Sequence, residues 1–239
     1  MTISLSDAGK RFNRDWVFRH FNYTFTSANS YAIVGPNGSG KSTLLQSIGG
    51  AIGLSEGKVV VNGAASGVRR ETSGVRRQAS DVSKEPADPG PKTSDRHLKA
   101  DTTENTYQYI SIAAPYLEVI EEMTVTEFLH FHQAFKPLLP ALSVEEIIEA
   151  TGLGNAAHKQ IRYYSSGMKQ RVKLAQAIFS DVPVILLDEP CTNLDSTGIA
   201  LYQQLINTYC KQRLVIVSSN DEAEYGFCEA KINMIEYKK

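Results

Sequence analysis

One short stretch constrains the fold of this chain more than any other. Residues 35–42 read GPNGSGKS and fit the pattern G-x-x-x-x-G-K-[ST], with a short apolar run at 31–34 before them and a helical pattern at 41–48 after them. Glycines let the backbone curl until consecutive amide N–H groups point at phosphate oxygens, and the start of the following helix adds its positive end. Because average residue frequencies give a chance match of only about one percent in such a chain, the stretch predicts an α/β fold built around a phosphate-binding turn.

The same turn predicts how a nucleoside triphosphate, with ATP as the expected ligand, is held. We expect Lys41 to reach the β- and γ-phosphates, the Ser42 hydroxyl to ligate Mg²⁺, and Thr43 to contact the α-phosphate. The nucleotide-contacting residues expected from this turn are Gly35, Pro36, Asn37, Gly38, Ser39, Gly40, Lys41, Ser42 and Thr43.

A second chemical signal lies at the end of a buried apolar strand. Residues 184–187 are all apolar, and Asp188, Glu189 and Pro190 follow them directly. In open α/β sheets, ligands bind at the carboxyl ends of the strands. We therefore expect Asp188 to hold Mg²⁺ through water and Glu189 to polarise the water that attacks the γ-phosphate. Without the phosphate-binding turn, two acids capping an ordinary strand would be the better interpretation.

The rest of the chain predicts strands alternating with helices, which indicates a mainly parallel sheet covered on both faces. Further strands are expected around 21–25, 58–61, 214–217 and 231–235, and further helices at 168–179 and 198–210. A Thr or Ser followed three residues later by Glu is typical of a helix start, and Thr124 with Glu127 has this spacing. Ser143 and Glu146 repeat it. These two starts predict a small helical lobe at about 115–163.

Composition limits the remaining possibilities. Residues 64–106 carry few large apolar side chains and are rich in Ser, Thr, Pro, Gly and charges, so we expect a flexible insertion there. The formal net charge of -1 gives no reason to expect nucleic acid as a partner. Three widely spaced cysteines, Cys191, Cys210 and Cys228, favour a reducing compartment. The sequence shows neither a signal-peptide core nor an apolar run long enough to span a bilayer.

Two further segments extend these motifs. Residues 164–171, YSSGMKQR, resemble the signature LSGGQ-x-Q-R of the ATP-binding-cassette (ABC) ATPases, and they lie just before the acidic strand as in that family. Residues 192–195, TNLD, resemble the D-loop of the same family. The chain is thus similar to ABC ATPases over most of its length. The resemblance implies a RecA-like P-loop NTPase core with a mainly parallel sheet, an N-terminal antiparallel β-subdomain and an inserted α-helical subdomain.

The resemblance also implies how the chain is divided. Residues 1–239 are expected to form a single ABC ATPase domain without a second cassette. The nucleotide-binding core is expected at 1–63 and 164–239, the flexible insertion at 64–106, and the lid segment with the helical subdomain at 107–163.

In that family, two nucleotides are sandwiched between two subunits arranged head to tail, which implies a homodimer or a pair with another ABC subunit. The resemblance implies that Ser165 and Gly167 contact the γ-phosphate bound to the partner and that Asp195 lies at the dimer seam. A helix starting near Ser165 offers anion-binding donors, although the serine pair at 165–166 also fits a plain helix N-cap. Phe12 matches the aromatic residue that stacks on adenine, with a core phenylalanine as the alternative.

Three departures from the family pattern bear on turnover. The signature carries Tyr164, Ser166 and Met168 where Leu, Gly and Gln are usual. The lid stretch at 111–116 lacks the glutamine that senses the γ-phosphate in the family. Asn220 stands where a switch histidine is usual, and it can donate one hydrogen bond to phosphate but cannot carry a positive charge, so we expect slow turnover. The residues expected to act in catalysis are Lys41, Glu189 and Asn220.

The resemblance implies an ATP-binding and ATP-hydrolysing subunit of an ABC transporter, in which ATP-driven dimer closure is coupled to a separate membrane-spanning permease. Apolar residues at 115–123 are expected to receive the permease, unless they only pack the helical lobe. The subunit would then be cytoplasmic and peripheral at the inner face of the cell membrane, held there by the permease. Two alternatives stay open: a soluble ABC-type ATPase switch, and a hydrolysis-deficient regulatory clamp that binds ATP.

Overall fold

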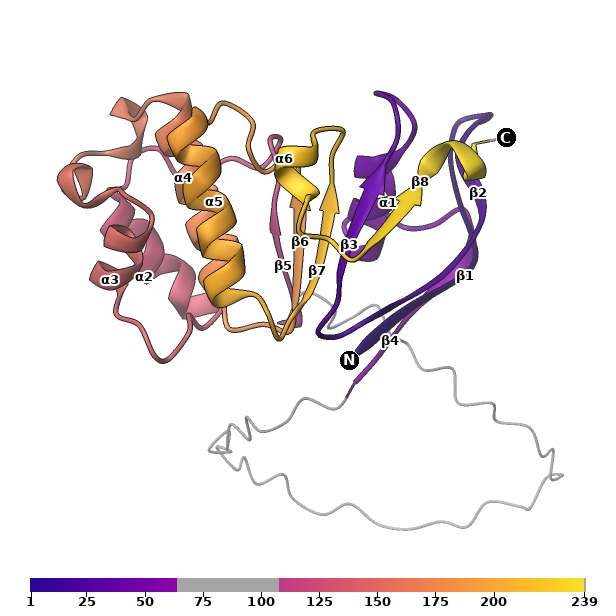
Figure 1. Cartoon of the computed structure of the whole chain (residues 1–239), viewed down its shortest axis with the longest axis horizontal. Helices are drawn as coiled ribbons and strands as arrows, with labels where there is room; N and C mark the ends of the chain where they lie inside the picture. Colours follow the sequence, from indigo (N-terminus) through magenta and orange to yellow (C-terminus); the bar gives the residue numbers. More distant parts are fainter. Residues whose placement is uncertain (64–107, 239) are drawn as a thin grey trace, which may run out of the picture. The chain divides into compact units, whose positions relative to one another are not determined.

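The computed structural model describes residues 1–63 and 108–238, whose strands form two sheets (Figure 1). One sheet has three strands in the order β2-β1-β4, and the other has five strands in the order β5-β6-β7-β3-β8. The stretch expected to form a flexible insertion, 64–106, lies outside the described residues.

The five-stranded sheet positions the chemistry because its strand pairs are parallel. Its strands are β3 (Ser30–Val34), β5 (Ile110–Ala113), β6 (Val184–Asp188), β7 (Leu214–Ser218) and β8 (Ala230–Asn233). The register sets Asp188 beside Ser218, and Ser218 beside Ile33. The ends of β6 and β7 therefore lie next to the end of β3, where the phosphate-binding turn begins.

Two apolar cores cover the two faces of this sheet, as the alternation along β6 shows. Val184 and Leu186 belong to the core that contains α1 (Lys41–Ile48) and the antiparallel sheet. Ile185 and Leu187 belong to the other core. That second core contains residues of α2 (Val125–Phe135), α3 (Val144–Ala150), α4 (Ser166–Phe179) and α5 (Ser196–Tyr209). Since successive side chains of a strand point to opposite faces, the sheet is the middle of three layers, as predicted.

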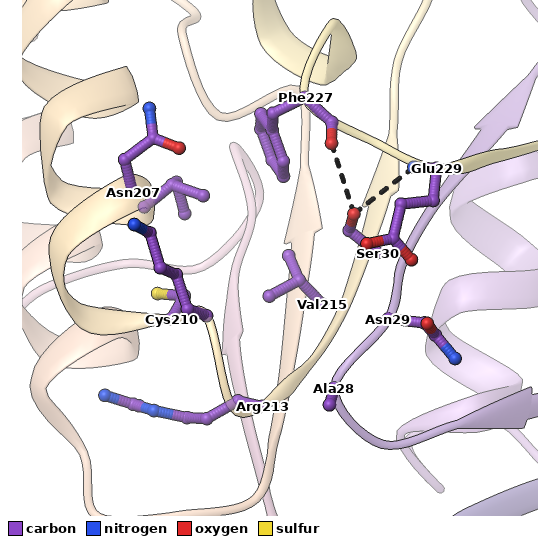
Figure 2. A pocket seen from close by; sticks show the side chains of 11 residues that line it. Ala28, Asn29, Ser30, Asn207, Cys210, Arg213, Val215, Phe227 and Glu229 are labelled. Carbon is purple, nitrogen blue, oxygen red and sulfur yellow. Dashed lines mark hydrogen bonds between the residues drawn. The ribbon is translucent and has the colours of Figure 1, made fainter.

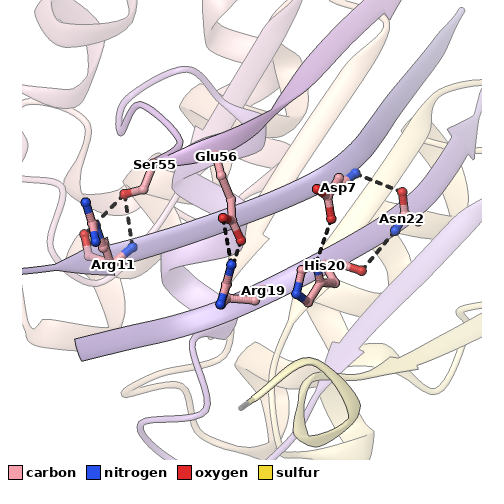
Figure 3. Close-up of polar contacts among 7 residues, drawn as sticks. All are labelled: Asp7, Arg11, Arg19, His20, Asn22, Ser55 and Glu56. Carbon is pink, nitrogen blue, oxygen red and sulfur yellow. Dashed lines mark hydrogen bonds and ion pairs between the residues drawn. The ribbon is translucent and has the colours of Figure 1, made fainter. Parts of the chain in front are cut away.

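The three-stranded sheet is antiparallel and consists of β1 (Thr2–Phe12), β2 (Asp15–Thr26) and β4 (Glu56–Asn62). Phe21 and Phe25 of β2 are buried, as their alternation with polar residues predicts. Arg19 donates two hydrogen bonds to Glu56, at 2.7 and 3.0 Å, and so links the outer strands β2 and β4 (Figure 3). The predicted N-terminal antiparallel subdomain is confirmed.

Both predicted capping boxes start helices. The Thr124 hydroxyl accepts from the Glu127 amide at 3.2 Å, and the Glu127 carboxylate accepts from the Thr124 amide at 2.8 Å. Ser143 and Glu146 make the same reciprocal pair at the start of α3. The described helices also include two short 3-10 turns, Gly154–Ala156 and Ile161–Tyr163, and the four-residue α6 (Glu222–Tyr225).

The structure differs from the sequence expectations at two strands. Ile110–Ala113 lies in the range assigned to the lid and helical segment, yet it forms β5 and pairs with β6 in the parallel sheet. The last strand ends at Asn233 rather than Ile235, because the Asn233 side chain accepts from the Ile235 amide at 3.1 Å and starts a 3-10 turn, Met234–Tyr237.

None of the helices in the two described ranges is both long enough and apolar enough to cross a bilayer. Cys191, Cys210 and Cys228 carry free thiols.

Candidate nucleotide-binding site

The phosphate loop connects β3 to α1 through three glycines with positive φ. The φ angles are 145° at Gly35, 75° at Gly38 and 98° at Gly40. Residues other than glycine rarely adopt such values. Gly40 is also the N-cap of α1, and within the described chain no side chain caps this helix start. The first amides of α1 are therefore left to a ligand, which is the arrangement that binds phosphate.

Lys41 folds back over this loop. Its ammonium donates to the Gly35 carbonyl at 2.7 Å and to the Pro36 carbonyl at 3.4 Å. Burial lowers the pKa of Lys41, while the charges of Glu189 and Asp188 act in the opposite direction. The two acids thus lie close enough to interact with the ammonium. The Lys41 ammonium therefore donates to loop carbonyls the hydrogen bonds that it could otherwise donate to phosphate oxygens.

The acidic end of β6 offers a site for a cation. Asp188 is only 2% exposed, and among the described residues its Oδ1 atom has no hydrogen-bond partner. The neighbouring Ser218 hydroxyl is also buried without a partner in this part of the chain. A buried carboxylate oxygen without a hydrogen-bond partner lowers the stability of the fold. Such an oxygen suits Mg²⁺, which prefers oxygen ligands. Asp188, with the Ser42 hydroxyl in the first turn of α1, therefore fits this ion.

Glu189 follows Asp188 in a strained but well-fixed backbone conformation. Its φ is 43°, in the left-handed region, and its amide donates to the Ser218 carbonyl at 2.9 Å. The side chain is exposed, unlike that of Asp188. One acid is therefore buried at the cation position, and the next can reach a water molecule in the open site.

Asn220 contacts the phosphate loop directly. Its Nδ2 atom donates to Asn37 Oδ1 at 2.9 Å, which joins two residues that the sequence predicted for the same site. Lys238 also reaches the loop, donating to the Gly38 carbonyl at 3.2 Å. No sequence pattern indicated Lys238, since the contact depends on the pairing of β8 with β3, which brings the last turn alongside the loop.

The signature and D-loop residues form a second cluster. Ser165 caps α4, accepting from the Met168 amide at 3.3 Å, so the plain N-cap interpretation holds in this state. A Cβ atom on Gly167 would lie 2.9 Å from the Asn193 carbonyl oxygen, so only glycine allows this close approach. Asp195 caps α5 by accepting from the Gly198 amide at 2.8 Å, and this bond, with one from Thr197, lowers the pKa of Asp195.

The exposure of side chains bears on two other predictions. Phe12 ends β1 and is 49% exposed, with the Lys10 ammonium 5.0 Å from its ring centroid, so the core alternative is wrong. Among the apolar residues expected to receive a permease, Tyr116 and Ile120 are exposed. Val119 is buried in the core of the helical lobe, so its assignment to that surface is wrong.

A separate pocket lies at the opposite edge of the parallel sheet, where β3 and β7 begin (Figure 2). Its lining includes Ser30, Val215 and Phe227 but none of the predicted site residues. The Ser30 hydroxyl donates to the Phe227 carbonyl and accepts from the Glu229 amide, both at 3.3 Å. The Ser30 hydroxyl is therefore satisfied locally, in contrast to the Ser218 hydroxyl, which has no partner among the described residues.

A glycine turn leads from a strand to a helix whose start no described side chain caps, and a buried acid lies at the end of a parallel strand in the same sheet; together they define a P-loop nucleotide-binding protein. The sequence profile of the ABC transporter family matches residues 18–192. The chain belongs to the ABC transporter family, as an ATP-binding and ATP-hydrolysing subunit. The soluble switch and the hydrolysis-deficient clamp are not favoured by this result.

Individual relatives agree with this assignment. The chain is 25% identical over 97% of its length to the uncharacterized ABC transporter ATP-binding protein YybJ of Bacillus subtilis, covering 92% of that protein. It is 27% identical over 88% of its length to the phosphonates import ATP-binding protein PhnC 2 of Oceanobacillus iheyensis, covering 74% of it. The dimeric structure of the bacterial ABC transporter cassette MJ0796 matches with a TM-score of 0.71 at 20% identity, over 97% of this chain and 94% of that one. The predicted fold class is confirmed.

Proposed function

We propose that the loop at 35–43 holds ATP together with Mg²⁺, and that its occupancy drives two subunits together beneath a membrane permease. The observation that carries the proposal is the Asp188 carboxylate, which is buried and has an oxygen without a hydrogen-bond partner among the described residues. Its strand β6 is separated by β7 from β3, the strand that leads to α1, whose start no described side chain caps. In this proposal Ser42 and Asp188 hold Mg²⁺, directly and through water, and the ion neutralises phosphate charge when bound. We keep the expected division into a nucleotide-binding core at 1–63 and 164–239 and a lid with helical subdomain at 107–163, with β5 as the part of the second range that joins the core sheet.

Lys41 and Asn220 change partners when ATP binds. The Lys41 ammonium leaves the Gly35 carbonyl for the β- and γ-phosphates, a stronger charge-assisted contact. The Asn220 amide leaves Asn37 for the γ-phosphate. Glu189 then orients and polarises the attacking water from its exposed position. Because Asn220 cannot supply the charge of a histidine, we expect slow turnover.

The second subunit completes the site in a head-to-tail dimer, either with an identical copy or with another ABC subunit. Ser165 and Gly167 at the start of α4 bind the γ-phosphate held by the partner, since a helix start favours an anion. Asp195 lies at the seam. The family match and the dimeric arrangement named for the MJ0796 structure support this proposal.

The permease docks on the segment at 115–123, where the exposed Tyr116 and Ile120 offer apolar contact area. The relatives named as transport proteins support such a partner. The subunit would accordingly work at the inner face of the cell membrane, attached through the permease. Phe12, exposed at the end of β1, stacks on the adenine ring.

Replacing Lys41 by alanine tests the site. We expect Lys41→Ala to weaken the binding of a fluorescent ATP analogue by about 100-fold, because charge-assisted contacts to phosphate are lost. ATP-dependent self-association, measured by analytical ultracentrifugation in the Glu189→Gln background that slows hydrolysis, should disappear. Lys58→Ala, at an exposed lysine of β4, is the matched control. Unchanged affinity and self-association in Lys41→Ala would refute the proposed site.

A further inference from the structure

Three different elements hold the backbone of the turn that follows β6. The Glu189 amide donates to the last carbonyl of β7 at 2.9 Å. The Pro190 carbonyl accepts from the Gln170 side chain of α4 at 2.7 Å. The Cys191 amide donates to the Glu224 carboxylate of α6, also at 2.7 Å. The backbone that carries Glu189 is therefore fixed by contacts with β7, α4 and α6.

The contact from α6 uses a buried acid. Glu224 is only 5% exposed, and burial raises the pKa of its carboxyl group, which shows that the charged form is disfavoured there. A methionine side chain of similar length would fill the same space without burying a charge. Methionine offers the Cys191 amide no comparable acceptor. What glutamate provides at this position is therefore the oxygen that accepts from Cys191, rather than the filling of the core.

The short helix α6 also connects this contact to the segment that carries Asn220. α6 begins directly after Asp221, whose side chain caps the helix. The Asn220 side chain, one residue earlier, contacts the phosphate loop. α6 is also attached to α5, because the Tyr202 hydroxyl donates to the Glu224 carbonyl at 2.8 Å. Glu224 therefore joins the segment of Asn220 to the turn of Glu189.

The backbone conformation of Glu189 requires such support. A φ of 43° is sparsely populated by residues with a side chain, and it persists only where surrounding contacts fix it. The Cys191 amide lies two residues after Glu189, so its release would let the turn relax toward a less strained conformation. That relaxation would change the direction in which the Glu189 side chain points.

We propose that Glu224 is a positioning residue for hydrolysis, which holds the Cys191 amide and thereby keeps the Glu189 carboxylate aimed at the attacking water. The inference rests on the proposed role of Glu189 as the base. Glu224 acts through the backbone of the turn and not through the nucleotide, so ATP affinity should not depend on it. A displacement of about 1 Å at a reacting group can lower a rate about a hundredfold, so loss of the contact should appear in kcat.

The test separates turnover from binding in the assembled transporter. We expect Glu224→Met to lower kcat roughly tenfold and to leave the affinity for a fluorescent ATP analogue unchanged. Glu224→Gln keeps an acceptor oxygen for the Cys191 amide and should retain most of the wild-type kcat. Glu222→Met makes the same exchange at an exposed position of α6, and this matched control should change neither quantity.

A double-mutant cycle shows whether Glu224 acts through Glu189. In the Glu189→Gln background, Glu224→Met should lower the remaining single-turnover rate by much less than tenfold, because no base is left to position. A role confined to the stability of the fold predicts the same relative loss in both backgrounds, and that result would contradict the inference.

Two further results would overturn the inference: an unchanged kcat in Glu224→Met, or equal losses of kcat in Glu224→Met and Glu224→Gln. Melting temperature and circular dichroism of each variant show whether the fold is intact. If Glu224→Met does not fold, Glu224→Asp replaces it. This variant shortens the side chain and withdraws the acceptor, so it should also lower kcat without changing affinity, and an unchanged kcat would overturn the inference.

Glu189→Gln separates the inference from the proposed function. If Glu189→Gln stops turnover while Glu224→Met turns over like the wild type, only the role of Glu224 fails. If Glu189→Gln itself turns over like the wild type, the assignment of the base fails, and the role of Glu224 fails with it.

Discussion

The starts of α1 and α2 meet the same physical problem in opposite ways. α2 satisfies its first amides with its own residues, through the reciprocal bonds of Thr124 and Glu127. α1 begins at Gly40 with no side-chain cap in the described chain, and the buried Ser39 hydroxyl beside it also lacks a partner among the described residues. The start of α2 satisfies its polar groups within the chain. The start of α1 leaves amide donors and a buried hydroxyl without partners among the described residues.

The difference separates residues that hold the fold from residues that serve the ligand. Capped helices and filled cores contribute to stability without nucleotide. Unpartnered polar groups cost stability without nucleotide and recover it on binding, because a ligand that binds only the folded state stabilises it. Variants in the two regions should therefore affect different measurements.

The largest effect should come from the acidic edge. We expect Glu189→Gln to lower the ATPase rate of the assembled transporter about a thousandfold, since general-base catalysis contributes on that order. The melting temperature should stay within a degree or two, roughly, because the side chain is exposed. Glu145→Gln, at an exposed acid in the first turn of α3, serves as control for both assays. A large loss of stability in Glu189→Gln would break the comparison.

The helical lobe should show the reverse pattern. Leu129 is fully buried in its core, and Leu129→Ala should lower the free energy of unfolding by about 3 kcal/mol through lost burial and a cavity. Urea unfolding followed by circular dichroism measures this loss. The ATP affinity of the folded fraction should remain unchanged, and a parallel loss of affinity would contradict the separation of the two regions.

A matched pair of hydroxyl deletions tests the helix starts themselves. Thr124→Ala should cost about 1 kcal/mol of stability, because it leaves the Glu127 amide without its cap. Ser39→Ala should leave stability unchanged or slightly raised, because the hydroxyl it removes is buried without a partner in the described chain. Equal losses from both, measured by thermal unfolding without nucleotide, would show that the phosphate loop is as self-sufficient as α2.

The smallest effect concerns pH and the helical lobe. Burial lowers the pKa of His132 from 6.5 to about 4, with the charge of Lys136 as a second cause. The unfolded chain then binds more protons, so the stabilising contribution of neutral His132 is full above pH 6.5 and is lost as the pH falls through about 4. His132→Gln should flatten the fall in melting temperature over this range, while the melting temperature at pH 7 should change little. The exposed neighbour variant His130→Gln should retain the wild-type slope.

The sequence predicted best those elements that depend only on residues near one another in the chain. The glycine turn at 35–42, the capping boxes and the apolar run at 184–187 each depend on neighbouring residues, and their elements lie where they were expected. The strand β5 was missed because it is short and includes Ser111. The Ser111 hydroxyl is buried, and it is satisfied there because it donates to the Ala177 carbonyl at 2.7 Å. This contact joins distant parts of the chain.

The parts of the site that depend on such distant contacts could not be predicted. Asn220 was expected on phosphate, but its hydrogen bond to Asn37 follows from the order of β3 and β7 in the sheet. Sequence spacing identifies the groups that carry the chemistry, while strand order decides which of them become neighbours.

At Glu189, backbone strain and the proposed role in hydrolysis fall on the same residue. An L-amino acid at a φ of 43° stores on the order of 1 kcal/mol of strain, which glycine would release. The substitution that relieves this strain, Glu189→Gly, is therefore also one that removes the proposed base. A chain that keeps glutamate at this position therefore also keeps the strained backbone conformation.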